Sequence, residues 1–237
     1  DSLLSDQNYT DGKDLQMYPM VAGAVVPVYN IALKPVPTPA AGATAITLPK
    51  LVLDRQTLVD IYNGTITMWD DPKIVALNPG LKDYLPAGAA ITTVHRSDSS
   101  GTTEIFTKAL TSFSADWKAG GASSVQWPGK GLGGKGNAGV AAQVIANANS
   151  IGYVELSYAL SNGMSVAQLV NKAGDTVTAN GASVEAAMAD PAFTFTDKLT
   201  ATIVDSGAKG AWPITGYTYI ILHTTSMTDC VKAQKLL

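Results

Sequence analysis

Cysteine is almost absent from this sequence, and long apolar runs are absent altogether. The single cysteine, Cys230, rules out an internal disulfide and any zinc site built from cysteines, and we place it in the last helix as a small apolar residue. No run of 18 apolar residues occurs, which argues against a membrane span. No signal peptide is recognisable either, so we interpret the sequence as mature or trimmed.

Charge is also scarce: 16 Lys and Arg stand against 19 Asp and Glu, a formal net charge of −3. This balance provides no basic field of the kind that gathers nucleic acid or acidic membranes, so we expect no nucleic-acid partner. Only two histidines occur, His95 and His223, and no cluster of histidines and carboxylates predicts a metal site or a cofactor. The chain does contain 46% hydrophobic residues, enough for the core of one large domain or of two lobes.

Helical and strand patterns alternate along the chain, which predicts an α/β fold in layers. Residues 1–18 are polar and irregular, whereas the valine-rich residues 20–30 predict a strand buried on both faces. Further strands are expected at residues 92–95, 151–155, 166–170, 176–178 and 215–223. Helices are expected at residues 54–64, 71–78, 102–110, 137–148, 157–161, 183–189 and 228–237.

The stretch 94–110, VHRSDSSGTTEIFTKAL, has the pattern strand, turn, helix. The first N–H groups of a helix lack partners within it and carry the positive end of its dipole, so a turn of small residues there can bind an oxyanion. Arg96 adds a cationic fork, and Asp98 would repel an anion unless the ligand brings a proton to share. The simpler interpretation of the same residues is an ordinary helix N-cap.

Two other motifs suggest chemistry that their context does not support. Residues 129–136, GKGLGGKG, fit two nucleotide-binding patterns, but no apolar strand precedes them and Gly136 replaces the Ser or Thr of a P-loop. We therefore expect a flexible loop that leads into the next helix. Ser99 and Ser100 lie at a strand-to-helix turn near His95, yet the flanking glycines of a nucleophile elbow are missing.

Several stretches, taken in order, resemble the phosphate-binding proteins of the PstS family, the periplasmic receptors of the bacterial phosphate importer. RSDSSGTTEIFT is similar to that family's RADGSGTSFVFT segment. The remaining matches are DSLLSD, TLVDIYNGTITMWDDPKIVALNPGL, GLGGKGNAGVAA, SIGYVELSYA and AWPIT, and together they extend through nearly the whole chain. The family's first strand and helix before residue 1, and its last helices after residue 237, have no counterpart in this sequence.

The resemblance implies a two-lobed, type II periplasmic-binding-protein-like fold, with mixed sheets flanked by helices and the ligand in the cleft between the lobes. Residues 1–27 and 211–237 would form part of the first lobe, and residues 28–210 the second lobe with the anion-binding turn. The implied phosphate ligands are Asp1, Arg96, Ser100, Gly101 and Thr102. Asp98 would pair with Arg96, and Asp1 would accept a hydrogen bond from protonated phosphate, which sulfate cannot donate at neutral pH.

The function that the resemblance implies is non-catalytic binding of inorganic phosphate, with delivery to a membrane ABC transporter as a possible further step. The expected protein is a monomer in the periplasm or outside the cell, and Asn8 and Asn63 would carry glycans only in a eukaryotic secretory pathway. Three alternatives stay open. The first is a receptor for another tetrahedral oxyanion, and the second is a secreted hydrolase that acts at the Ser100 turn. The third is a secreted or surface protein that kept the fold for adhesion or assembly and lost ligand specificity.

Overall fold

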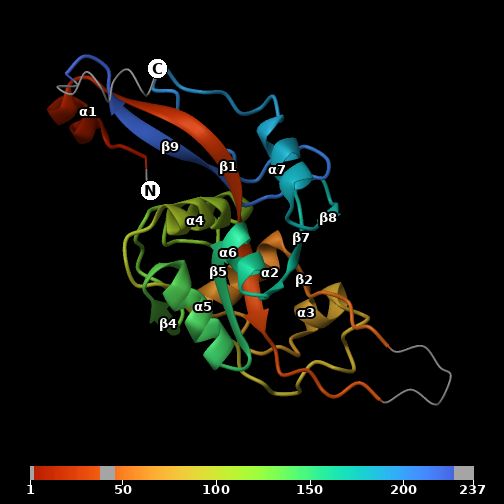
Figure 1. Cartoon of the computed structure of the whole chain (residues 1–237). Coiled ribbons are helices and arrows are strands. Elements are labelled where there is room, and N and C mark those ends of the chain that lie inside the picture. The colour runs from red at the N-terminus through yellow and green to blue at the C-terminus, as the bar shows by residue number, and fades with distance from the viewer. Residues whose placement is uncertain (1–2, 38–45, 227–237) are drawn as a thin grey trace.

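A computed structural model describes residues 3–37 and 46–226, and it has the predicted α/β organisation (Figure 1). The helices are α1 (Asp6–Gly12), α2 (Arg55–Asn63), α3 (Pro72–Leu77), α4 (Gly101–Phe113), α5 (Gly136–Ala146), α6 (Leu156–Ser161) and α7 (Gly181–Met188). The strands are β1 (Leu15–Asn30), β2 (Val52–Asp54), β3 (Thr92–Arg96), β4 (Gly131–Gly134), β5 (Ser150–Glu155), β6 (Ser165–Val166), β7 (Gln168–Val170), β8 (Thr176–Val177) and β9 (Thr215–His223). Cys230 and the predicted helix 228–237 lie outside the described residues.

Strand β1 connects two parts of the molecule because it changes partner halfway along its length. Its first half, from Leu15 to Ala24, pairs antiparallel with β9, whereas Val25 to Asn30 pair antiparallel with β5. The sheet then continues in the order β4-β3-β5-β1-β6, in which β3 runs parallel to both β4 and β5. A second, three-stranded sheet has the order β2-β7-β8.

The hydrophobic core lies around the β1–β5–β3 centre of the larger sheet. Val26, Val28, Ile151 and Val154 are fully buried, as expected for strands covered on both faces. Helix α4 contributes Phe106, whose ring stacks on Tyr153 of β5 at a centroid distance of 4.2 Å. These contacts fix α4, and therefore the turn before it, against the central sheet.

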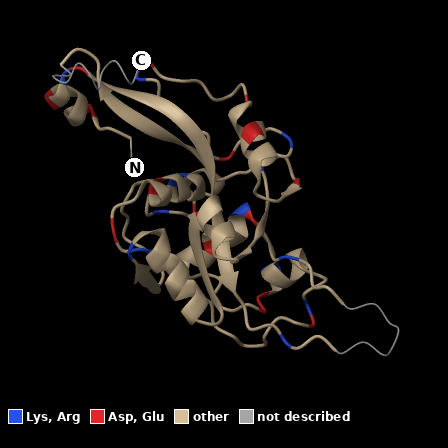
Figure 2. Cartoon of the chain, in the orientation of Figure 1, with Lys and Arg blue, Asp and Glu red and all other residues tan. Residues whose placement is uncertain are grey.

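The β1–β9 ribbon extends from this core toward α1 and is free of charged residues (Figures 1 and 2). Met20 and Val21 of β1 are exposed by 65% and 61%. At the far end the Asp14 carboxylate accepts hydrogen bonds from the His223 ring and from the backbone of Thr225 and Ser226, which closes the ribbon. At the near end Trp212 is fully buried and donates its indole N–H to the Val25 carbonyl at 2.9 Å.

Two predictions about the start of the chain are wrong. Residues 6–12 form α1 instead of an irregular segment, because Ser5 and Asn8 make a reciprocal capping box. Strand β1 begins at Leu15 rather than at residue 20, because β9 supplies hydrogen-bonding partners for residues 15–19. Burial on both faces holds for Val25, Val26 and Val28 but not for the exposed residues 20 and 21.

The glycine-rich stretch is also not the expected flexible loop, since residues 131–134 form strand β4 at the edge of the sheet. Gly134 lies directly under α5: a Cβ atom at this position would stand 2.4 Å from the carbonyl carbon of Gly139. Gly136 has a φ of +67°, a conformation that glycine adopts without strain, and this starts α5 immediately after the strand. The glycines therefore serve close packing of a strand against a helix.

Candidate anion-binding site

The turn between β3 and α4 is built by local capping. Ser100 is in an extended conformation, with φ −155° and ψ 132°, and its hydroxyl accepts a long hydrogen bond of 3.4 Å from the Thr103 N–H. The Glu104 N–H bonds to the Ser100 carbonyl, which begins the regular helix. The predicted N-cap is therefore present, and it orients the first turn of α4.

Two donors remain open at this helix start. The Ser100 N–H donates to the Ser123 carbonyl at 2.9 Å, so it is not available to a ligand. The N–H groups of Gly101 and Thr102 have no acceptor among residues 3–37 and 46–226. Neighbouring N–H groups without acceptors at the positive end of a helix, here one of 13 residues, are of the kind that can bind an oxyanion.

Arg96 and Asp98 form a two-point ion pair beside the turn. Arg96 donates from Nε to Asp98 Oδ1 at 2.8 Å and from Nη2 to Oδ2 at 2.6 Å. The Gly136 N–H adds a third bond to Oδ1. These contacts hold the pKa of Asp98 well below its usual range, first through Arg96 and then through Gly136. Asp98 is thus an anion whose lone pairs are largely engaged by Arg96 and Gly136.

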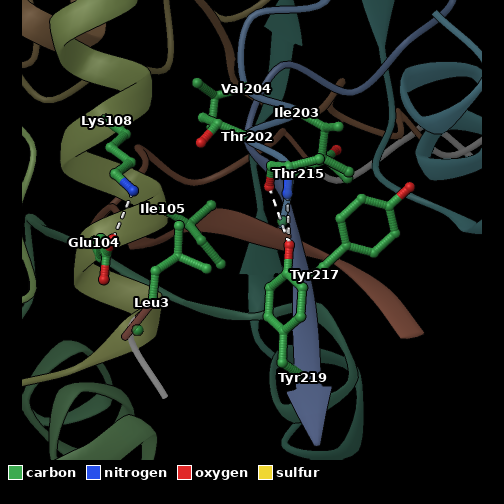
Figure 3. A pocket seen from close by; sticks show the side chains of 13 residues that line it. Leu3, Glu104, Ile105, Lys108, Thr202, Ile203, Val204, Thr215, Tyr217 and Tyr219 are labelled. Carbon is green, nitrogen blue, oxygen red and sulfur yellow. Dashed lines mark hydrogen bonds and ion pairs between the residues drawn. The ribbon is translucent and has the colours of Figure 1, made fainter. Parts of the chain in front are cut away.

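Two small cavities adjoin the start of α4, on the side that faces the ribbon. One, of about 150 Å³, is lined by Gly101 and Thr102 together with β1 and β9 residues such as Gly23 and Thr218. The other, of about 40 Å³, lies beyond Ile105, between α4 and residues 201–204 (Figure 3). Figure 3 shows the Glu104–Lys108 ion pair on the α4 side of this second cavity, and Tyr219 hydrogen-bonded to Ala201 on the opposite side.

The sequence reasoning missed Glu155, which lines the larger cavity at the end of β5. Its Oε2 caps α6 by accepting from the backbone of Ser157 and Tyr158. Its carboxylate is the acidic group that shares this cavity with the Gly101 and Thr102 donors. The motif SIGYVELSYA contained this residue, but only the pairing of Glu155 with Val25 places it near the turn.

The predicted ligands are only partly brought together. Ser100, Gly101 and Thr102 are consecutive at the start of α4, and Gly101 and Thr102 share a cavity. The Arg96 side chain is 8% exposed. It lines a different hollow of about 510 Å³, beside Trp127 and Lys130. Asp1 lies outside the described residues, so its predicted role stays a prediction.

The described residues give the hydrolase alternative no support. Ser100 Oγ accepts from Thr103, Ser99 Oγ donates to Ser123, and the His95 ring stacks on Trp127 at 4.9 Å. In the part of the chain that is described, no hydrogen bond joins either serine to His95. Within the same ranges, no group of three or more His, Cys, Asp or Glu side chains is placed to hold a metal ion.

Charged residues are dispersed over the described part of the molecule (Figure 2). Residues of both signs are scattered over it, and no extended cluster of one sign surrounds the turn in the described ranges. An anion bound there would depend on local donors rather than on long-range attraction. None of the helices in the described ranges has the length and apolar character needed to cross a membrane.

An α/β fold with two helix N–H groups beside a cavity can bind an oxyanion, and comparison with known proteins shows the family of the chain. The PBP superfamily domain matches residues 1–233, so the chain belongs to the PBP superfamily. Its curated relatives include the phosphate-binding proteins PstS of Xylella fastidiosa, 42% identical over 210 residues, and of Methanocaldococcus jannaschii, 37% identical over 218 residues. The resemblance to the PstS family is thereby confirmed.

The matches cover most of this chain but not of its relatives. They include 88% and 86% of the chain, whereas the chain spans about half of each relative, 53% and 52%. Among solved structures, a phosphate-bound putative phosphate ABC transporter substrate-binding protein from Clostridium perfringens aligns with a TM-score of 0.59 at 17% identity. That alignment covers 98% of this chain and 68% of the other. It confirms the predicted α/β fold.

Proposed function

We propose that the protein containing this chain binds inorganic phosphate non-covalently in a cleft, with the start of α4 as one wall of the site. The observation that carries this proposal is the pair of open N–H groups at Gly101 and Thr102, which line a cavity in a chain related to phosphate-binding proteins. Asp1, Arg96 and Ser100 remain further proposed ligands. Ser100 would contribute its hydroxyl, because its N–H is engaged by Ser123, and Arg96 would have to reach from the neighbouring hollow that it lines. Asp98 orients and partly neutralises Arg96.

The geometry supports binding rather than catalysis. Backbone N–H groups and a guanidinium can hold a phosphate oxyanion, but they provide neither a nucleophile nor a general base. The serines of the turn are engaged in capping and in a bond to Ser123. We therefore keep the hydrolase only as a control in the experiments.

Transport is the physiological role that fits this binding function. The relatives from Clostridium perfringens and Vibrio cholerae are described as a substrate-binding protein and a receptor of phosphate ABC transporters. By kinship we propose that the protein works outside the cytoplasm, in the periplasm or at the cell surface, and delivers phosphate to a membrane transporter. The proposed receptor acts as a monomer, since a closing cleft requires only one chain.

The test is calorimetric titration of the whole protein with phosphate and then with sulfate at pH 7. We expect phosphate to bind with micromolar or better affinity and sulfate to give no heat, because sulfate has no proton to donate. Equal binding of sulfate, molybdate and phosphate would favour a general tetrahedral-oxyanion receptor. Absence of phosphate binding in a folded whole protein would overturn the proposal, and turnover of a chromogenic ester that Ser100→Ala abolishes would favour the hydrolase.

A further inference from the structure

Tyr153 is the buried polar side chain that lies between the two ends of the anion-binding turn. It comes from the middle of β5, opposite Pro27 of β1, and its side chain is fully buried. Its hydroxyl accepts the Arg96 N–H at 3.2 Å and shares a hydrogen bond of 2.7 Å with the Thr103 hydroxyl. One oxygen atom therefore joins the last residue of β3 to the first turn of α4.

We propose that the Tyr153 hydroxyl is a positioning group that sets the geometry of the Gly101 and Thr102 N–H donors. This inference rests on the proposed phosphate site, to which it adds a residue that touches no ligand. Six residues, 97–102, separate Arg96 from Thr103, and few hydrogen bonds form within this segment. One of them, from the Thr103 N–H to the Ser100 hydroxyl, is 3.4 Å long and therefore weak. The two hydrogen bonds of the Tyr153 hydroxyl are shorter and connect the residues on either side of the segment.

The surroundings of Tyr153 make this bridge rigid. Its ring stacks on Phe106 of α4 at an interplanar angle of 10°, so ring and hydroxyl bind the same helix at two points. Burial raises the pKa of Tyr153 to about 12, so the hydroxyl stays protonated at neutral pH and can both donate and accept. Arg96 is held on its side-chain end by Asp98, which fixes the other end of the bridge.

The same aromatic cluster contains a matched control. Tyr62 is as deeply buried as Tyr153, lies 6.2 Å from it, and packs edge-on against the same Phe106 ring at 4.9 Å. Its hydroxyl has no hydrogen-bond partner among the described residues. Tyr62→Phe and Tyr153→Phe therefore remove the same atom from the same cluster, but only the second substitution removes contacts to the turn.

The experiment compares both variants of the whole protein in two measurements. In calorimetry at a temperature where both are fully folded, Tyr153→Phe should weaken phosphate binding about tenfold, as expected when one or two hydrogen bonds that orient the donors are lost. Tyr62→Phe should stay within about twofold of the unsubstituted protein. Thr103→Val should cause part of the loss, because it breaks the bond between Thr103 and Tyr153 but leaves the one from the Arg96 N–H. The double variant Tyr153→Phe/Thr103→Val should lose little more than Tyr153→Phe alone, because both changes break the same Tyr153–Thr103 bond.

The second measurement needs no ligand. Amide hydrogen exchange at Thr103 and Glu104 should become faster in Tyr153→Phe and not in Tyr62→Phe, while exchange at the far end of the β1–β9 ribbon, near Asp14, stays unchanged. Equal effects of the two tyrosine variants, or unchanged exchange at the turn, would overturn the inference. If the unsubstituted protein bound no phosphate, the proposed function would fail, and the exchange data would still decide whether Tyr153 positions the turn.

Discussion

At the scale of single residues, the start of α4 places a helix-capping side chain next to backbone N–H groups that can bind a ligand. Ser100 caps the helix and is buried, whereas the next two N–H groups have no acceptor in the described chain. A helix of this length would ordinarily leave such donors to water. Here they line a cavity of about 150 Å³ between the helix and the ribbon, which is large enough for several water molecules or a small oxyanion.

Gly101 allows a test that removes one of the two backbone donors at the start of α4. Proline is favoured at the first position of a helix and lacks an N–H group, and the extended Ser100 before it is compatible with proline. In the whole protein we expect Gly101→Pro to weaken phosphate binding about ten- to a hundredfold, because one charge-assisted hydrogen bond is lost. Calorimetric titration at pH 7 measures the effect.

Gly101→Ala is the control, since it adds a carbon atom at the same position and keeps the N–H group. Thermal unfolding of both variants shows whether the helix start is intact. We expect the affinity for phosphate to decrease from glycine to alanine to proline at position 101. Equal phosphate affinity of the alanine and proline variants would mean that this N–H group does not contact the ligand.

The sequence alone predicted the residues of the turn but not what holds them. Ser100, Gly101 and Thr102 stand together in one motif, so the position of the donors follows from local signals. Tyr153 and Glu155 come from a strand some 50 positions away, and only the β1–β5 and β3–β5 pairings bring that strand beside the turn. The residue pattern within a short stretch of sequence does not show which distant strands will pair.

At the scale of elements, the ribbon of β1 and β9 depends on a cluster at its far end. The Asp14 carboxylate accepts from the His223 ring at 2.7 Å and from the backbone and hydroxyl groups of Thr225 and Ser226. These hydrogen bonds, first the one from His223, hold the pKa of Asp14 far below its ordinary value. A carboxyl group with a lowered pKa in the folded state stabilises that state above its unfolded pKa of about 4.

The stabilising effect of Asp14 should therefore be fully present at neutral pH and decline as the pH falls below about 4 toward the lower folded pKa. We predict that Asp14→Asn lowers the unfolding temperature at pH 7 and makes its decline between pH 4 and pH 2 shallower. Thermal unfolding followed by circular dichroism over this pH range is the measurement. Asp83→Asn, at an exposed carboxylate, is the control and should follow the unsubstituted protein. Parallel curves for Asp14→Asn and the unsubstituted protein would contradict the prediction.

Elements with strong periodicity were predicted well, and those made by pairing were not. Strand β9 has the predicted bounds, and α4, α5 and β5 differ from the predicted bounds by one to three residues. Strand β4 was missed because its sequence is Gly-Leu-Gly-Gly, which has little strand propensity and pairs only because β3 lies alongside. The first residues of β1 include Pro19 and lack alternation, so their strand conformation comes from β9.

At the scale of the whole molecule, β1 is the element that both proposed lobes share. The predicted division, with residues 28–210 as one lobe, is a proposal, and the change of partner between Ala24 and Val25 supports a boundary within a few residues of it. The Val25 N–H bonds to the Ile214 carbonyl at 2.9 Å, and the Trp212 indole bonds to the Val25 carbonyl, so β1 and the segment before β9 meet where β1 changes partner. A hinge at this place would let the ribbon move relative to α4.

If the two lobes close on the ligand, the whole protein should become more compact when phosphate is added. Small-angle X-ray scattering should give a smaller radius of gyration with saturating phosphate than without it, and sulfate at the same ionic strength is the control. Closure should also slow hydrogen exchange less at the amides near Val25 and Ile214 than at amides within each lobe, because hinge residues absorb the motion. An unchanged radius in a protein that binds phosphate would exclude closure of this kind.

The shared strand also affects how the polypeptide is made. His223 at the end of β9 is 209 positions from Asp14, the residue just before β1, so the earlier strand leaves the ribosome long before its partner exists. At a translation rate of about 5–20 residues per second, the wait is roughly 10 to 40 s. During this time the edge of β1, with Met20 and Val21, has no partner strand, and an unpaired apolar edge is a template for aggregation. Capture by a chaperone, or folding delayed until β9 has been synthesised, would keep this edge of the nascent chain from aggregating.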